Sequence, residues 1–131
     1  MFVDASALTA ILAREPGADE LIVRLEQARN KVTSPMAVWE TSVAMARILG
    51  LEPRTACSDV LEYLSVAGIE LEEVPAATAI SAIDAFERFG KGRHKAGLNF
   101  GDCFAYACAR HFNMPLLYKG ADFAQTDIEA A

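Results

Sequence analysis

Four acidic residues lie inside or directly after apolar stretches, where a neutral side chain is the usual choice. They are spread along the whole chain and are Asp4, Glu40, Asp102 and Asp122. No histidine or cysteine accompanies them at the spacing of a metal site. Carboxylate oxygens are the ligands that hard cations such as Mg²⁺ and Mn²⁺ prefer. The first hypothesis is therefore a metal-dependent phosphodiester chemistry at a site that the fold must assemble.

Three of these acids also have an ordinary structural explanation. Asp4 could cap a helix or form a turn, and Asp122 could be a turn residue. Asp102 lies three residues after Asn99, which is the spacing of a capping box. An acid in the first turn of a helix is also favoured by the helix dipole. None of the three is therefore a site residue by its local sequence alone.

Glu40 is harder to explain by local structure. Its neighbours three and four residues away on a helix are all apolar: Met36, Ala37, Val43 and Ala44. An unpaired carboxylate is costly on such a face, although Arg47 could form a structural ion pair with it. Like charges about 4 Å apart repel by roughly 4 kcal/mol at an effective dielectric constant near 20. A cation would remove that repulsion, so the four acids together favour a metal site.

The composition is that of one globular domain covering residues 1–131. The apolar fraction is 53%, and a chain of this length buries roughly two thirds of its unfolded surface. No run of about 18 apolar residues predicts a membrane span, and the N-terminus lacks the basic region of a signal peptide. Three cysteines without a C-x-x-C spacing indicate thiols in a reducing compartment. We therefore expect a cytoplasmic protein.

The net charge of −6 does not by itself favour nucleic-acid binding. Setting aside the four acids leaves only −2 for the rest of the chain. Basic side chains are concentrated in one segment, at Arg88, Lys91, Arg93, His94 and Lys95. This segment is either a solvated loop or a contact to a phosphate backbone.

Strands and helices alternate along the chain. Strands are expected at 2–4, 31–34, 69–74 and 116–118, with a short edge strand at 126–128, and helices at 6–14, 18–29, 35–49, 53–66, 75–89 and 100–112. Ser6 is the expected cap of the first helix. This order predicts an α/β fold with a central parallel sheet of four to five strands flanked by helices. Sites in such sheets lie at the carboxyl ends of strands, so Asp4 and Asp122 meet if the first and fourth strands are neighbours.

Four segments resemble the PIN domain, and more closely the VapC ribonuclease toxins of bacterial toxin–antitoxin pairs. These segments are Val3–Leu8, Glu40 after a Ser-Pro strand end, Gly97–Cys103 and Leu117–Phe123. They cover the whole chain in the order and spacing of that family. The resemblance implies a PIN fold and an endonuclease that cuts single-stranded RNA with Mg²⁺ or Mn²⁺, leaving a 5′-phosphate and a 3′-hydroxyl.

The resemblance also implies roles for individual residues. The catalytic and metal-binding quartet is Asp4, Glu40, Asp102 and Asp122, with Asp4 and Asp102 as the principal ligands of the first metal. Ser6, Asn99 and Asp127 are supporting residues, and Arg93, Lys95 and Lys119 are candidate RNA contacts. A cognate VapB-type antitoxin and a homodimer are the implied partners. Apolar residues of two successive helices, among them Trp39 and Tyr63, are expected mostly in the core, with some lining a groove for the antitoxin.

Other classes of protein fit less well. A phosphoacceptor receiver domain would use Lys119, but it needs an acid after a middle strand, where this chain has Ser34-Pro35. A haloacid-type phosphatase needs a second acid two residues after Asp4, where Ser6 stands. A non-catalytic acidic interaction module remains as an alternative, and it predicts no affinity for metal.

Overall fold

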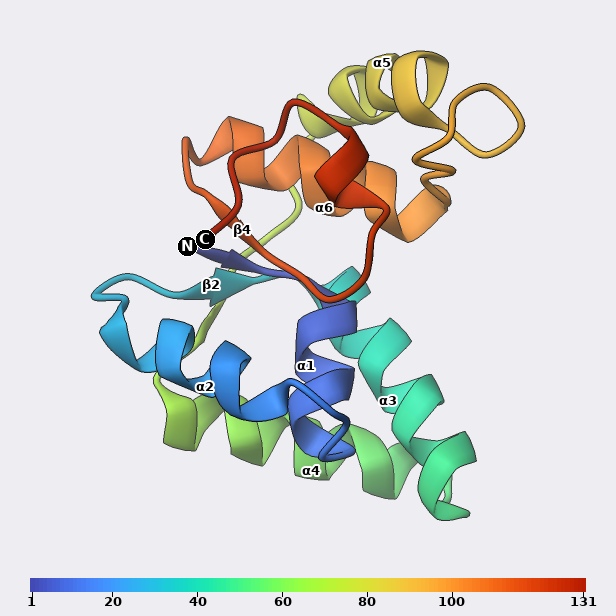
Figure 1. Ribbon diagram of the computed structural model, residues 1–131. Coiled ribbons are helices and arrows are strands. Elements are labelled where there is room, and N and C mark those ends of the chain that lie inside the picture. Colours follow the sequence, from blue (N-terminus) through green and yellow to red (C-terminus); the bar gives the residue numbers. More distant parts are fainter.

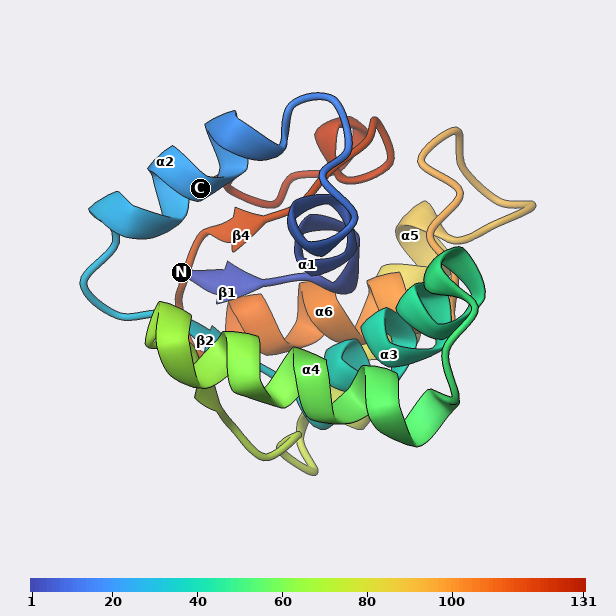
Figure 2. The ribbon, with the colours of Figure 1, turned by 90° about the horizontal axis from the view of Figure 1, so that it is seen from below.

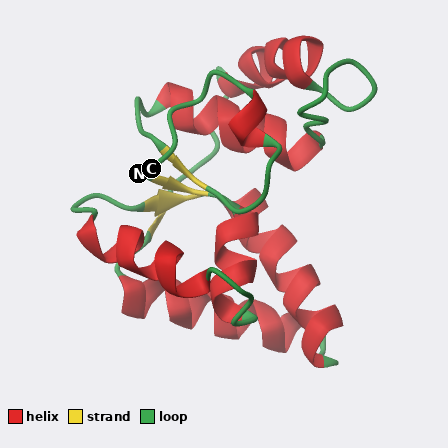
Figure 3. Ribbon diagram, viewed as in Figure 1, coloured by secondary structure: helices red, strands yellow, loops and turns green.

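The computed structural model describes residues 1–131, and a sheet of four short strands lies at its centre (Figures 1 and 3). The strands are β1 (Phe2–Val3), β2 (Val32–Thr33), β3 (Glu70–Leu71) and β4 (Leu116–Leu117). All pairings are parallel and the order is β3-β2-β1-β4. The predicted α/β class and parallel sheet are confirmed, and β1 and β4 are neighbours.

Six helices cover the two faces of this sheet. They are α1 (Ala5–Leu12), α2 (Ala18–Gln27), α3 (Pro35–Leu49), α4 (Pro53–Ala67), α5 (Thr78–Phe89) and α6 (Phe100–His111). In Figure 1, α5 and α6 lie above the sheet and α1, α2 and α4 lie below it. Figure 2 shows α4 running across the lower side, with α3 behind one of its ends. Helix α3 packs on α1 and α4 and also contacts α6, so it joins the two layers.

The two neighbouring strands β1 and β4 contribute to a core on both faces of the sheet. Phe2 and Leu116 are fully buried toward α5 and α6, in one apolar cluster. The following residues, Val3 and Leu117, are fully buried in a second cluster with α1 to α4. Successive side chains of a strand point to opposite faces, and burial on both faces is typical of parallel sheets. The carboxyl ends of β1 and β4 are thereby held in a fixed relation.

The structure corrects two predicted helix starts. Asp4, not Ser6, caps α1: the Asp4 side chain accepts a hydrogen bond from the Ser6 backbone N–H. Helix α5 begins at Thr78 and not at Pro75, because a turn closes first, with the Thr78 hydroxyl donating to the Pro75 carbonyl at 2.6 Å.

The C-terminal segment also differs from the prediction. Residues 126–128 form no strand, and the edge contact is a single parallel bridge between Leu116 and Ala130. A short 3₁₀ helix, η1 (Phe123–Gln125), precedes it. The sheet therefore has four strands. None of the helices has the length and apolar character needed to cross a membrane.

Candidate active site

The four acids that the sequence singled out line one cleft of about 430 Å³. Asp4 directly follows β1, and Asp122 lies in the segment between β4 and η1. Glu40 is on α3 and Asp102 is in the first turn of α6. The starts of α1 and α3 lie together at the carboxyl end of the sheet (Figure 1). The adjacency of β1 and β4 thus brings Asp4 and Asp122 to one site, as the parallel topology predicted.

Asp4 is the most firmly held of the four acids. Asp4 is 4% exposed, and its carboxylate accepts two hydrogen bonds from Ser6, one from the backbone N–H at 2.9 Å and one from the hydroxyl at 2.5 Å. Burial raises the pKa of Asp4, and the bonds from Ser6 oppose that rise. The Ser6 hydroxyl oxygen in turn accepts from the Lys119 backbone N–H at 3.0 Å. Ser6 therefore ties the end of β1 to the end of β4.

Glu40 has no cationic partner. The structure contains two ion pairs, Arg88–Asp127 and Lys119–Glu15, so the structural pairing of Glu40 with Arg47 is wrong. Burial, followed by repulsion from the neighbouring carboxylates of Asp4 and Asp102, raises the pKa of Glu40 to about 7. This carboxyl group is held among other acidic side chains, where a cation would stabilise its charged form.

Gly101 leaves the space that the Glu40 carboxylate occupies. A methyl group in place of the glycine hydrogen would lie 1.9 Å from Glu40 Oε1. A side chain at residue 101 would therefore displace the Glu40 carboxylate from its position beside the start of α6.

Asp102 combines a structural role with a place in the cleft. The Asn99 side-chain oxygen accepts from the Asp102 backbone N–H at 3.0 Å, and Asp102 Oδ2 accepts from the Asn99 N–H at 2.8 Å. This is the capping box that the spacing predicted. Burial is the main cause that raises the pKa of Asp102 to about 6, and repulsion from Asp4 and Asp122 adds to it. The box uses Oδ2 and leaves Oδ1 without a hydrogen-bond partner.

Two charged residues complete the cleft lining. Lys119 is the one cation there, and its ammonium group lies 3.2 Å from Glu15 Oε2 and donates to the Pro16 carbonyl. Glu15 is a fifth acid of the cleft that the sequence did not identify. It directly precedes the Pro16-Gly17 turn. The sequence of a turn does not indicate the direction of a side chain, so Glu15 could not be identified as a cleft residue.

The chemistry of the cleft suits a hard divalent cation, because its donors are oxygens that carry excess negative charge. As they stand, however, no three acidic, histidine or cysteine side chains are grouped closely enough to hold one ion. Repulsion between unneutralised carboxylates favours such separation. The side chains must therefore close in for an ion to be coordinated by several of them at once.

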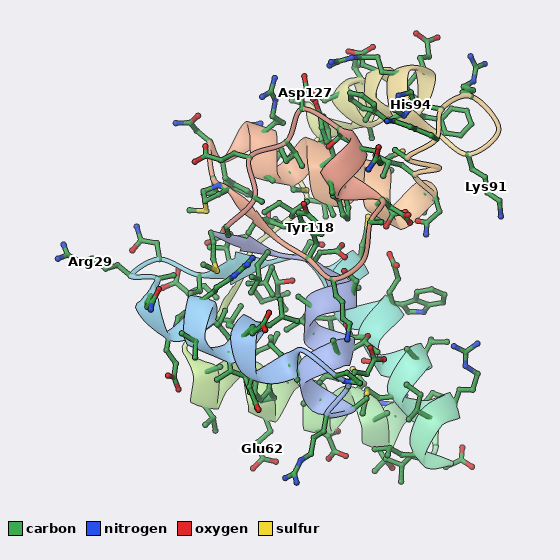
Figure 4. All side chains as sticks on the ribbon, in the orientation of Figure 1. Arg29, Glu62, Lys91, His94, Tyr118 and Asp127 are labelled. Atoms are coloured by element: carbon green, nitrogen blue, oxygen red, sulfur yellow. The ribbon has the colours of Figure 1, made fainter.

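Other predicted site residues lie elsewhere. Asp127 accepts from the Tyr106 hydroxyl at 2.6 Å and from Arg88 at 2.7 Å. These bonds lower the pKa of Asp127, that from Tyr106 contributing most, and fasten the C-terminal segment to α5 and α6 (Figure 4). Arg93 lies over the Phe86 ring, and neither it nor Lys95 lines the acidic cleft.

The fold and this cleft define a class of protein. A family model described as the PIN domain matches residues 1–129, and the chain belongs to that family.

Its curated relatives are VapC ribonucleases. The chain is 41% identical to ribonuclease VapC of Mycolicibacterium smegmatis, over 99% of this chain and 98% of the relative. It is 40% identical to ribonuclease VapC30 of Mycobacterium tuberculosis, over 98% and 95% respectively. The chain is thus a member of the VapC ribonucleases. Its fold also matches a crystal structure of the toxin VapC20 of Mycobacterium tuberculosis, with a TM-score of 0.76 at 18% identity, over 99% of this chain and 97% of that one.

Proposed function

We propose that this chain hydrolyses RNA with the aid of a divalent cation bound in the acidic cleft. As a VapC ribonuclease it is the toxin of a toxin–antitoxin pair, with an RNA substrate and an antitoxin partner. The observation that carries the catalytic proposal is the convergence of Asp4, Glu40, Asp102 and Asp122 on one cleft. Burial raises the pKa values of Asp4, Glu40 and Asp102, and repulsion from neighbouring carboxylates adds to the rise at Glu40 and Asp102.

The acids divide by how they are held. Asp4 and Asp102 are the proposed principal ligands, because hydrogen bonds fix one carboxylate oxygen of each. Glu40 and Asp122 would complete the shell, directly or through water, or hold a second ion. Mg²⁺ and Mn²⁺ both suit oxygen ligands. When bound, such a cation lowers the pKa of coordinated water and stabilises charge on a phosphate. Ser6 and Asn99 support the site by holding Asp4 and Asp102.

Among the basic residues, Lys119 has the strongest claim to contact the substrate. It lines the cleft and would meet a phosphate that lies against the acids and their cation. Arg93 and Lys95 are exposed on the loop after α5, where they would contact more distant phosphates. Replacing both by Gln should weaken RNA binding and flatten its dependence on salt. If the dependence of RNA affinity on salt concentration is unchanged in this variant, the loop is a solvated segment that does not contact RNA.

The metal proposal is tested with three variants. Asp4→Asn and Asp102→Asn should keep the far-ultraviolet spectrum of the folded protein but lose RNA cleavage and Mn²⁺ binding by calorimetry. Asp127→Asn is the matched control, since this acid lies outside the cleft, and it should keep both. Cleavage that persists in excess EDTA would exclude a metal mechanism. RNA binding without any heat of Mn²⁺ binding would favour the non-catalytic acidic module.

We also propose a homodimer and a surface for the antitoxin. The apolar residues expected mostly in the core are divided: Leu64 is buried, whereas Trp39, Ile48 and Leu49 are exposed. Tyr63 lines a hollow of about 420 Å³ between α2 and α4, which suits an apolar helix face of an antitoxin. A sedimentation coefficient that stays monomeric at all concentrations would contradict the dimer. A cytoplasmic location remains a prediction.

A further inference from the structure

An aromatic hollow of about 630 Å³ adjoins the acidic cleft. Its walls come from the start of α3 and the start of α6, and its lining residues are Pro35, Met36, Trp39, Glu40, Asn99, Phe100 and Gly101. Glu40 and Asn99 line both the hollow and the cleft. The two spaces are therefore adjacent, so that an RNA strand bound in one would extend toward the other.

The two large rings of the hollow are unusually exposed. Trp39 is 67% exposed and Phe100 is 71% exposed. The Phe100 ring packs against the Phe104 ring, with the ring centroids 5.0 Å apart and an angle of 58° between the ring planes. Exposed aromatic surface beside a polar cleft is typical of a binding site. Neither ring contributes to the two core clusters, so neither is explained by packing within this chain.

The chemistry of the hollow favours a nucleobase over a phosphate. No cation lines it, and its one ionisable side chain is Glu40, which would repel a phosphate. Nucleobases are neutral and stack on aromatic rings whatever their sequence. Asn99 adds a polar group: its side-chain oxygen accepts from Asp102, while its amide N–H groups have no partner in the structure. Those N–H groups are free to donate to an acceptor on the edge of a base.

We propose that Trp39 and Phe100 stack a nucleobase of the RNA strand next to the phosphate held in the acidic cleft. This inference rests on the proposed ribonuclease function. It adds a subsite that positions single-stranded RNA, because a base paired in a duplex does not offer its face to a protein ring. The hollow then sets which phosphate lies over the acids.

Trp39 is the only tryptophan of the chain, so its fluorescence reports on this subsite directly. In an Asp4→Asn background, a short single-stranded RNA of randomised sequence should quench the emission. The same oligonucleotides made with abasic sites should quench less and bind more weakly. The expected loss of affinity is roughly 5- to 150-fold, the range for stacking of one base.

Variants separate stacking from folding. In an anisotropy assay with labelled RNA, Trp39→Ala and Phe100→Ala should lose affinity by the same range, and Trp39→Phe should recover most of it. Affinity for Mn²⁺ should not change. Val43→Ala is the matched control, because Val43 is an exposed apolar residue of the same helix outside the hollow.

The outcomes distinguish the subsite from the activity on which it rests. If the unmodified protein cleaves RNA but Trp39→Ala cleaves and binds it equally well, the subsite is overturned and the ribonuclease function stands. If the fluorescence of Trp39 does not change when RNA is added but shifts with protein concentration, the hollow is a contact surface with a second copy of the chain. The proposal is then wrong. If the unmodified protein cleaves no RNA, both proposals fail.

Discussion

Replacing Gly101 by Ala is expected to separate activity from stability. Gly101 lies in the first turn of α6 with its backbone against the Glu40 carboxylate. Its backbone is helical and its φ is not positive, so alanine is compatible with it. Within a helix, alanine is favoured over glycine by roughly 0.5 to 1 kcal/mol. Seen from the backbone alone, the substitution should not destabilise the protein.

The size of the effect on the cleft follows from the distances. The added methyl carbon would lie 1.9 Å from Glu40 Oε1, whereas contacts under 3.0 Å are essentially never observed. The carboxylate must therefore retreat by at least 1.1 Å, the difference between these two distances. Because the obstructed atoms are the far end of a flexible side chain, the movement costs little stability. A displacement of about 1 Å at a catalytic group can reduce a rate on the order of 10²-fold.

The assay combines cleavage kinetics with thermal unfolding and a double-mutant cycle. Gly101→Ala should unfold at or above the temperature of the unmodified protein, while its kcat/KM for RNA falls roughly a hundredfold. In a Glu40→Ala background the carboxylate is already absent, so adding Gly101→Ala should cost no further activity. Wild-type activity in the single variant would refute the reasoning. Equal losses with and without Glu40 would show that Gly101 acts by another route.

Three further predictions concern the groups around the cleft. The raised pKa values of Glu40 and Asp102 mean that the folded state binds more protons than the unfolded state between pH 4 and 7. The free energy of unfolding of the metal-free protein should therefore fall as pH rises through this range. Binding of Mn²⁺ should restore the lost stability. Thermal unfolding at several pH values, with and without Mn²⁺, measures the two effects. Ser6→Ala removes a hydrogen bond to the buried carboxylate after β1 and should destabilise by about 1 to 3 kcal/mol in urea. Asp127→Ala leaves the Tyr106 hydroxyl without its partner and should cost on the order of 1 kcal/mol, with RNA cleavage unchanged.

The positions of the acids were largely predictable, because the sheet topology determines which residues lie together at its edge. Alternating strands and helices imply a parallel sheet, and a parallel sheet collects the residues that follow its strands at one edge. Asp4 and Asp122 needed only the adjacency of β1 and β4, which the sequence left as a condition. Glu40 was marked by its apolar neighbours, which agree with its half-buried position, whereas its proximity to Asp4 comes from the way α3 packs in the fold.

What the sequence could not predict depends on side-chain direction and on small spacings. The Glu40–Arg47 ion pair is a different case, because seven residues span about 10 Å along a helix and the spacing alone already argues against a direct pair. Trp39 was expected mostly in the core, but α3 carries apolar residues on more than one side, and Trp39 faces outward. Glu15, which lines the cleft, follows Arg14, whose backbone is left-handed with φ 53° where the chain leaves α1. No local pattern indicates that turn of the chain.

The way in which the acids are held bears on how a cation would enter the cleft. Asp4 is held by Ser6 and Asp102 by its capping box, and the Glu40 carboxylate lies against Gly101. Asp122 is exposed, and its side chain makes no hydrogen bond. Three carboxylates thus lie on parts of the fold that form without metal, and burial raises their pKa values, with repulsion adding to the rise at Glu40 and Asp102. The fourth lies on the segment after β4, and its approach to a bound ion is the change that would complete a coordination shell.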